Sequence, residues 1–454
     1  MSTHLGRRLA AGCASLSFLA SGTAVASATP QASFSATATA AGHHTGTLTD
    51  GATWIADVPS NWNGTVLLFS HGYGPTTAQD MPSPDSGAAL LAAGYALAGS
   101  SYDPHGSWWA LGSAERDHFQ TLDAFRATVA RPTRTIAVGE SMGGLVNAQI
   151  ARDGRGRVDG ALGLCGLVAG GVDLNDYQLA GEVVLATLLV PDAHLRLTGY
   201  SSPEEAAATA KTLTDAVVAA QQTPTGRARI ALAAAFLNLP DWAPDQPAPA
   251  PGDAAGQEAQ QEAWIAGGQL QFIVGGRVSI EQAAGGDSGS TAGLDWAAEL
   301  ASASHFGQIR SLYRMAGLDL GADLRALYAA PGYRPDPAAA AWMARTSTAG
   351  QRLAVPLLDL HTTADQLVPV EQENAFAARV RDAGDGRLLR QAYVGRQGHC
   401  AFTANEVLAG VQAVAQRIET GHWGDTSAAG LTATQPAGST AFVAYRPARL
   451  VDGH

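Results

Sequence analysis

Residues 136–146 read IAVGESMGGLV and combine three local signals. A β-branched run enters the segment, a Gly-x-Ser-x-Gly turn follows, and an apolar stretch of helical character leaves it. Glycine at Gly139 and Gly143 allows a sharp strand-to-helix turn without a Cβ clash, and such a turn exposes the hydroxyl of Ser141. The first amides of the following helix point toward any oxyanion that forms beside that hydroxyl. We therefore interpret Ser141 as a candidate nucleophile.

The motif alone does not identify a nucleophile, because a chain with 52 glycines in 454 residues can contain Gly-x-Ser-x-Gly by chance. The surrounding sequence supplies the context that the motif lacks. Apolar strand-like runs alternate with helical spacing through the first third of the chain, which is typical of βαβ units in a parallel sheet. The expected strands follow a hairpin at residues 45–58 and lie at residues 64–70, 95–100, 135–138 and 158–164.

The alternation stops near Gly170 and resumes late in the chain. Strand character returns at residues 353–361 and 388–394. Between these parts the sequence is alanine-rich and helical, with a proline-rich stretch at residues 240–251. We predict an α/β fold with a mostly parallel sheet and helices on both faces. Its core comprises residues 45–170 and 346–425, with a large helical insertion at residues 171–345 and a C-terminal tail at residues 426–454. An independent second domain in place of the insertion remains an alternative.

The N-terminal segment resembles an export signal. Arg7 and Arg8 precede an apolar, small-residue run, and residues 26–28 (ASA) offer a cleavage site. Glycine and serine interrupt the run, which makes it a poor membrane anchor. We expect residues 1–28 to be a signal peptide, residues 29–44 to be a linker, and the mature protein to be secreted without a stable membrane anchor.

The charge and the cysteine content exclude some classes of partner and cofactor. A net charge of −12 argues against nucleic acid as a partner, because binding to phosphates needs a basic surface. Removal of the signal peptide leaves Cys165 and Cys400, a candidate disulfide in an oxidising compartment, with two free buried thiols as the alternative. The sequence has no CxxC or Cys/His cluster, so we expect no metal site and no cofactor. It gives no indication of the oligomeric state.

A general base and an orienting acid are required beside a serine nucleophile. His399 stands in a glycine-flanked loop directly after the last expected core strand, where it could reach the top of the sheet. Its rival, His422, is expected to lie within the closing helix. Asp365 lies in the turn after the preceding strand and would fix the imidazole tautomer, whereas its rival, Asp359, lies inside an apolar strand. We predict the set Ser141, Asp365 and His399.

These motifs resemble the α/β-hydrolase superfamily in residues 45–170 and 350–425. The matching sequences are GESMGG around Ser141, ADQLVP around Asp365, GHC around His399, and SHGYG at residues 70–74. The resemblance implies an α/β-hydrolase fold, with the backbone N–H groups of Tyr73 and Met142 as oxyanion-hole donors.

Three other features extend this hypothesis. Trp108 and Trp109 follow the fourth expected strand and could form an acyl-binding wall or pack under the insertion, and both interpretations stay open. Cys165 ends the strand that follows the nucleophile strand, so a bridge to Cys400 would pin the loop of the base. Glu140 stands where secreted tannases and feruloyl esterases carry a cysteine for such a tether, so their arrangement is absent.

The sequence thus predicts a secreted serine esterase that cleaves a small-molecule or polymeric carboxylic ester through an acyl-enzyme intermediate. A secreted serine peptidase on the same fold is the main alternative, and a non-catalytic binding protein is a further one. The sequence does not identify the acyl group or its leaving group.

Overall fold

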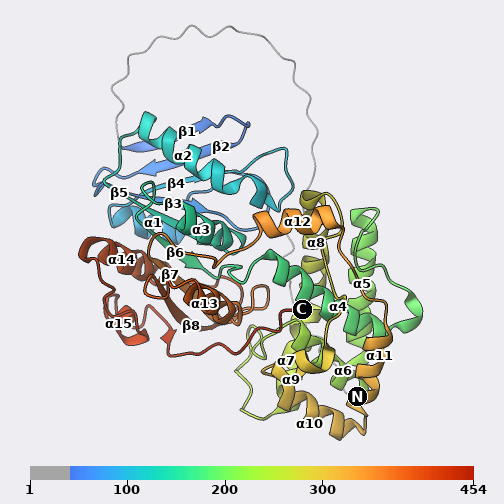
Figure 1. The fold of residues 1–454 in the computed structure, drawn as a ribbon. Helices are drawn as coiled ribbons and strands as arrows, with labels where there is room; N and C mark the ends of the chain where they lie inside the picture. Colours follow the sequence, from blue (N-terminus) through green and yellow to red (C-terminus); the bar gives the residue numbers. More distant parts are fainter. Residues whose placement is uncertain (1–40, 454) are drawn as a thin grey trace, which may run out of the picture. The chain divides into compact units, whose positions relative to one another are not determined.

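A computed structural model describes residues 41–453, so the predicted signal peptide lies outside the described residues. Nine strands of the described chain form one sheet in the order β1-β2-β4-β3-β5-β6-β7-β8-β9 (Figure 1). The six strands from β4 to β8 in this order run parallel, whereas β1, β2 and β9 pair antiparallel at the two sides. The strands are β1 (Gly42–Thr47), β2 (Thr53–Val58), β3 (Thr65–Ser70), β4 (Ala96–Ser100), β5 (Arg134–Glu140), β6 (Gly160–Leu164), β7 (Leu357–Ala364), β8 (Leu389–Gln397) and β9 (Phe442–Val443).

Helices cover both faces of this sheet. One face packs against α1 and α14, and the other packs against α2, α3 and α13. Successive residues of a strand point to opposite faces, so Leu67 and Phe69 of β3 join the α1/α14 core while Val66 and Leu68 join the α2 core. All six residues of β3 are buried, as expected for a central parallel strand. The core helices are α1 (Pro84–Ala92), α2 (Ala114–Thr128), α3 (Met142–Asp153), α13 (Gln372–Asp382), α14 (Ala404–Thr420) and the short α15 (Ala428–Ala433).

The chain between β6 and β7 forms a helical region that we call the cap, residues 171–346. Several cap helices begin where the sequence places a capping side chain: Ser202, Thr223 and Asp295 each accept a hydrogen bond from a first-turn amide. The helices are α4 (Gly171–Leu189), α5 (Pro203–Ala220), α6 (Pro224–Phe236), α7 (Ala254–Trp264), α8 (Leu270–Ala284), α9 (Trp296–Ser302), α10 (Phe306–Ala316), α11 (Leu320–Ala329) and α12 (Pro337–Thr346). A π-helical turn, Ile265–Gln269, joins α7 to α8.

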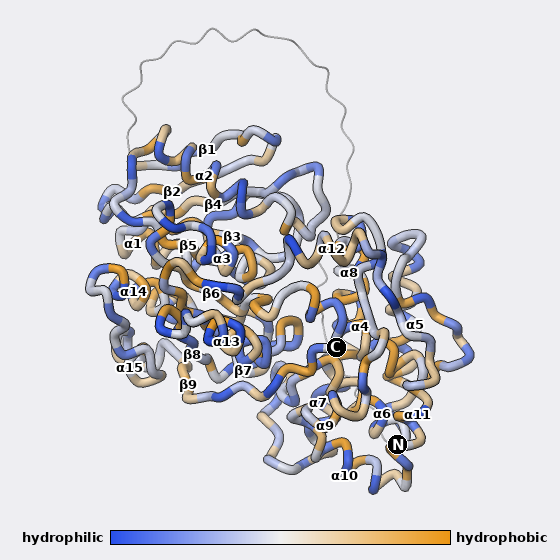
Figure 2. The backbone as a smooth tube through the Cα atoms, viewed as in Figure 1, coloured by the Kyte–Doolittle hydropathy of each residue, from blue (hydrophilic) through white to orange (hydrophobic). Residues whose placement is uncertain are grey.

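The cap has its own hydrophobic core, built mainly from α4, α6, α8 and α10. Figure 2 shows hydrophobic segments recurring both along the central strands and through these helices. Within residues 41–453, no helix is long and apolar enough to cross a bilayer.

The C-terminal tail, which the sequence left unplaced, connects the sheet to the cap. It supplies β9 beside β8 and then continues into the cap. Val451 is buried in the cap core, and its backbone exchanges two hydrogen bonds of 2.8 and 2.9 Å with the side chain of Asn238. The tail therefore holds the cap against the sheet-bearing core.

Candidate active site

Ser141 occupies a strained turn between β5 and α3. Its φ of 58° and ψ of −122° lie in a region that side chains rarely adopt, which costs roughly 1–3 kcal/mol. The turn depends on close backbone packing, because a Cβ at Gly143 would collide with the carbonyl oxygen of Ser70 and one at Gly139 with that of Gly143. This explains the glycine spacing of the motif and presents the hydroxyl at the carboxyl end of β5.

The structure joins the three predicted side chains by hydrogen bonds. The Ser141 hydroxyl lies 2.8 Å from Nε2 of His399, and Nδ1 of His399 lies 2.8 Å from Oδ2 of Asp365. With Nδ1 protonated, the imidazole donates to Asp365 and accepts from Ser141. The order of the elements explains the convergence: the serine follows β5, the acid follows β7 and the histidine follows β8, so all three lie at one edge of the sheet.

Asp365 is fully buried and held by four interactions. Its Oδ1 accepts hydrogen bonds of 2.9 Å from the amides of both Leu367 and Val368. Burial alone would raise the pKa of Asp365, but the charge and hydrogen bond of His399 and the charge of His361 outweigh it and hold the pKa below its ordinary value. The carboxylate therefore stays ionised beside the imidazole.

A second buried histidine stands behind this acid. Nε2 of His361 donates to the carbonyl oxygen of Val368 at 2.8 Å and lies 3.8 Å from Asp365, while Nδ1 contacts Glu373 at 3.0 Å. Burial lowers the pKa of His361, yet the hydrogen bond and charge of Glu373 outweigh it and raise the pKa. A protonated His361 thus adds positive charge near Asp365. The rival acid Asp359 lies inside β7, fully buried, and its pKa is raised by burial and by Glu373.

Glu140, directly before the serine, adds a titrating group to the site. Burial raises the pKa of Glu140 to about 7, and the nearby His399 partly opposes this shift.

Cys165 and Cys400 form a disulfide at the loop of the base. Cys165 follows β6 and is fully buried, and Cys400 is the residue after His399. Both flanking residues of His399 have positive φ, 101° at Gly398 and 53° at Cys400. The bridge therefore fixes the one loop that carries the base. Because both sulfurs are in the disulfide, their closeness to His399 does not provide a thiolate metal site.

The expected oxyanion donors are two backbone amides near the serine. Met142 is the first residue of α3, and its N–H has no acceptor within residues 41–453, nor does that of Tyr73. A Cβ at Gly72 would lie 3.1 Å from the Cβ of Ser141, so the backbone before Tyr73 passes close to the nucleophile. Both N–H groups are thus free to donate hydrogen bonds to a developing oxyanion, the role predicted for them.

A narrow apolar cavity of about 40 Å³ opens at Ser141 and His399. The core contributes residues including Tyr73, Trp109 and Leu167, and the cap contributes α4 and α8. Its cap residues are Leu174, Gln178, Phe272, Ile273, Gly276 and Ile280.

The two predicted tryptophans have different positions. Trp109 lines the cavity and is buried, with its indole N–H 3.4 Å from Oγ of Ser347 in the segment after α12, so it both forms the wall and packs under the cap. Trp108 is 44% exposed and does not line the cavity. Its ring packs edge-on against Tyr73, whose other neighbour is the equally exposed Phe272 of α8.

Sequence reasoning missed the cap side of this cavity. On α8, Ile273, Gly276 and Ile280 follow a spacing of three and four residues, which places them on one helix face. This spacing was readable in the sequence, but the same pattern occurs in other helices of the cap. His361 and Glu373 were also missed, since neither lies in a recognisable motif.

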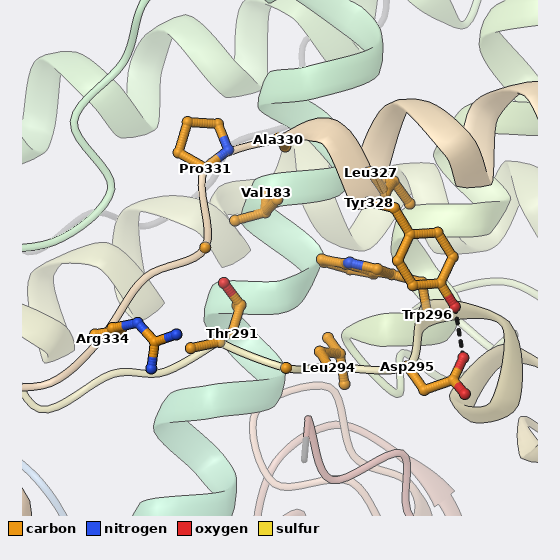
Figure 3. A pocket seen from close by; sticks show the side chains of 13 residues that line it. Val183, Thr291, Leu294, Asp295, Trp296, Leu327, Tyr328, Ala330, Pro331 and Arg334 are labelled. Atoms are coloured by element: carbon orange, nitrogen blue, oxygen red, sulfur yellow. Dashed lines mark hydrogen bonds between the residues drawn. The ribbon is translucent and has the colours of Figure 1, made fainter.

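A wider cavity of about 580 Å³ lies within the cap and contains none of Ser141, Asp365 and His399 (Figure 3). Its carboxylate, Asp295, caps α9 and accepts a hydrogen bond from the hydroxyl of Tyr328, drawn as the dashed line in Figure 3. These groups already serve the cap fold, so the smaller cavity at Ser141 is the candidate active site.

Comparisons with known proteins place these findings in context. No protein-family model matches the chain. An o-phthalyl amidase from Xanthobacter agilis is 28% identical over 433 residues, covering 87% of this chain and 91% of that protein. Feruloyl esterase B from Aspergillus oryzae has 14% identity and a TM-score of 0.37, covering 84% of this chain and 80% of its own. An esterase from Rhodococcus sp. ECU1013 has 16% identity and a TM-score of 0.38, covering 83% and 98%.

The sheet order and the positions of the site residues define the fold. A parallel sheet with the order β4-β3-β5-β6-β7-β8, antiparallel β2 at its side and a nucleophile turn after β5 is the α/β-hydrolase arrangement. The acid after β7 and the histidine after β8 follow the chain order of that fold. The chain therefore has the α/β-hydrolase fold.

Proposed function

We propose that the protein is a serine hydrolase that cleaves carboxylic esters of small, largely apolar acids through an acyl-enzyme intermediate. The observation that carries this proposal is the hydrogen-bond chain from Ser141 through His399 to Asp365, with both links at 2.8 Å. A serine hydroxyl is a weak nucleophile until an adjacent base takes its proton, and this arrangement supplies that base.

The reaction follows from the positions of these groups. His399 takes the proton of Ser141 while Oγ attacks the carbonyl carbon, and the N–H groups of Tyr73 and Met142 stabilise the oxyanion. The tetrahedral intermediate collapses, and His399 returns the proton to the leaving alcohol. Water then attacks the acyl-enzyme with His399 again as base, which releases the acid and restores the serine. Asp365 orients the imidazole and stabilises its protonated form.

The cavity supports an aromatic or branched acyl group as the substrate. Most of its side chains are apolar, including Leu167, Leu174 and Ile280, and Trp109 offers an indole surface. The exposed rings of Trp108 and Phe272 flank Tyr73 at the entrance, where they could contact an apolar leaving group.

A second candidate substrate is an amide of such an acid. The similarity to an o-phthalyl amidase over most of both chains favours it. Ester and amide cleavage use the same residues, but an amine leaving group depends more strongly on protonation by His399. A matched pair of p-nitrophenyl benzoate and benzoyl p-nitroanilide separates the two, because the acyl group is shared.

The central test is Ser141→Ala, assayed on p-nitrophenyl benzoate and by labelling with a fluorophosphonate. We expect labelling to disappear and kcat to fall by roughly 10³-fold or more. Ser304→Ala, at an exposed site in the cap, is the matched control and should behave as wild type. Turnover or labelling retained in Ser141→Ala would reveal another nucleophile and refute the proposal.

We also propose that the protein is secreted. The disulfide beside the base supports an oxidising location, since cytosolic disulfides are rare. Mass spectrometry of protein recovered from the culture medium should give a mature N-terminus at residue 29. Recovery of only full-length, reduced protein from the cytoplasm would contradict this proposal.

A further inference from the structure

Gln178 is an isolated amide in the wall of the active-site cavity. It lies four residues after Leu174 on α4, so both share one helix face, and both line the cavity. Gln178 is 7% exposed and makes no side-chain hydrogen bond within residues 41–453, and its amide atoms are not among the buried polar atoms of this part of the chain, so they remain accessible to the cavity. An accessible amide in an otherwise apolar wall keeps its donors and its acceptor available to a ligand, whereas a leucine at this position would offer neither.

Two residues of α4 that flank Gln178 hold this helix against α8. Asn175 accepts a hydrogen bond of 2.7 Å from Arg277 of α8, and Glu182 accepts another of 2.7 Å from the same guanidinium. All three side chains are buried. Gln178 lies between Asn175 and Glu182 in sequence, and α8 supplies the opposite wall of the cavity. The ion pair therefore holds the two helices that bound the cavity in a fixed relation, which pre-organises the amide for a ligand.

The charges around the cavity restrict what the amide can bind. No lysine or arginine is among the cavity residues, and the carboxyl groups of Glu140 and Asp365 lie close to His399. A carboxylate on the substrate would enter without a compensating cation and near existing negative charge. A neutral amide is instead matched to an uncharged group that donates or accepts a hydrogen bond.

We infer that Gln178 determines substrate specificity by hydrogen-bonding an uncharged oxygen substituent, a hydroxyl or carbonyl, on the acyl group in the cavity. The inference rests on the proposed function, because it assumes that the acyl group attached to Ser141 occupies this cavity. The inference restricts the proposed substrates to esters of acids that carry one such oxygen substituent. Aromatic acids are the main candidates among them.

The test compares p-nitrophenyl benzoates that differ only in one ring substituent. At each ring position, acetyl is paired with isopropyl and hydroxyl with methyl, because each pair has a similar shape but only one member has oxygen. The carboxy-substituted ester is a separate arm, corrected for its uncatalysed hydrolysis. The ratio of kcat/KM within each pair is measured for wild type, Gln178→Met and Gln178→Leu. Comparing the ratio between enzymes cancels the electronic effect of the substituent.

We expect wild type to favour the oxygen-bearing member at one ring position, and both Gln178 variants to lower this ratio by roughly five- to a hundredfold. Gln282→Met, at an exposed glutamine on α8, should leave the ratio unchanged. Equal ratios in wild type and a folded Gln178 variant would overturn the inference. So would a wild-type preference for the carboxylate over the uncharged oxygen substituents.

Failure of the inference is distinguishable from failure of the proposed function. If Ser141 reacts with fluorophosphonate and unsubstituted benzoate is hydrolysed, an unchanged ratio refutes only the role of Gln178. If Ser141 does not react and no ester is hydrolysed, both proposals fall. Two substitutions at position 178, each checked by fluorophosphonate labelling and thermal unfolding, keep the test valid if one of them does not fold.

Discussion

Removing the disulfide between Cys165 and Cys400 should reduce both stability and catalysis. The two cysteines are 235 residues apart in sequence. The bridge therefore closes a loop that contains the whole chain between the end of β6 and the base. The perturbation is the double variant Cys165→Ala/Cys400→Ala, together with reduction of the wild-type enzyme by dithiothreitol. The double variant replaces both sulfurs and leaves no free thiol that could react further.

The stability effect follows from the entropy of loop closure. For a loop of this size, the chain-entropy relation gives about 5.5 kcal/mol of stabilisation at 25 °C. Measured values often fall below this relation, so the figure is an upper bound. With an unfolding entropy of roughly 2 cal/mol/K per residue, loss of this stabilisation would lower Tm by about 6 °C for a folded unit the length of residues 41–453.

The catalytic effect arises because Cys400 is adjacent to His399. The loop has positive φ on both sides of the histidine, and without the bridge it can relax from this conformation. A displacement of about 1 Å at a catalytic group costs on the order of a hundredfold in rate. We therefore expect kcat on p-nitrophenyl benzoate to fall by about ten- to a hundredfold at temperatures well below the new Tm.

The assay measures Tm by differential scanning fluorimetry, and kcat and KM at 20 °C, with and without dithiothreitol. Dithiothreitol should reproduce the effect of the double variant in wild type and have no effect on the double variant itself. The reasoning would be refuted if fully reduced wild type, verified by thiol alkylation and mass spectrometry, kept its Tm within 1 °C and its kcat within twofold.

Three further substitutions test the electrostatics of the site and of the cap. Asp365→Asn should lower kcat by about 10³–10⁴-fold with little change in KM, because His399 loses the carboxylate that fixes its tautomer; an unchanged kcat would exclude that role. Since burial raises the pKa of Glu140 from 4.5 to about 7, its proton is lost more easily in the unfolded chain, and stability falls as pH rises through this interval. Glu140→Gln should thus raise Tm at pH 8 relative to wild type but not at pH 4; equal Tm differences at both pH values would contradict this. Arg277→Met should destabilise the protein by about 3–5 kcal/mol in urea unfolding, because it leaves Glu182 as a buried charge without its partner, whereas a loss under 1 kcal/mol would show that the pair is dispensable.

The parts of the site that the sequence revealed are those with local causes. The turn at Ser141 requires glycine on both sides because the backbone packs there, so it leaves a pattern in five consecutive residues. Asp365 and His399 each follow a strand directly, and parallel strands bring their carboxyl ends to one edge of the sheet. Local sequence and the rule of alternating strands and helices were sufficient for these residues.

The remaining wall of the cavity depends on contacts across the chain. Gln178 and Phe272 become neighbours of Ser141 only because α4 and α8 pack over the sheet edge, and no periodicity specifies which helix face meets the core. The buried ion pair between Glu182 and Arg277 spans 95 residues and has no local signature. The sequence could therefore predict a helical insertion without predicting the side chains that it contributes.

The cap and the sheet-bearing core are joined by hydrogen bonds at two separate points. Gln269, in the turn before α8, donates a 2.6 Å hydrogen bond to the carbonyl oxygen of Gln366, the residue after the acid Asp365. At another point, the backbone of Val451 in the tail bonds to Asn238 of the cap. One contact therefore reaches the loop of the acid, and the other ties the cap to the strand that follows the base. A cap held in this way does more than cover the cavity: the position of α8, which forms its wall, is linked directly to the loop that orients His399.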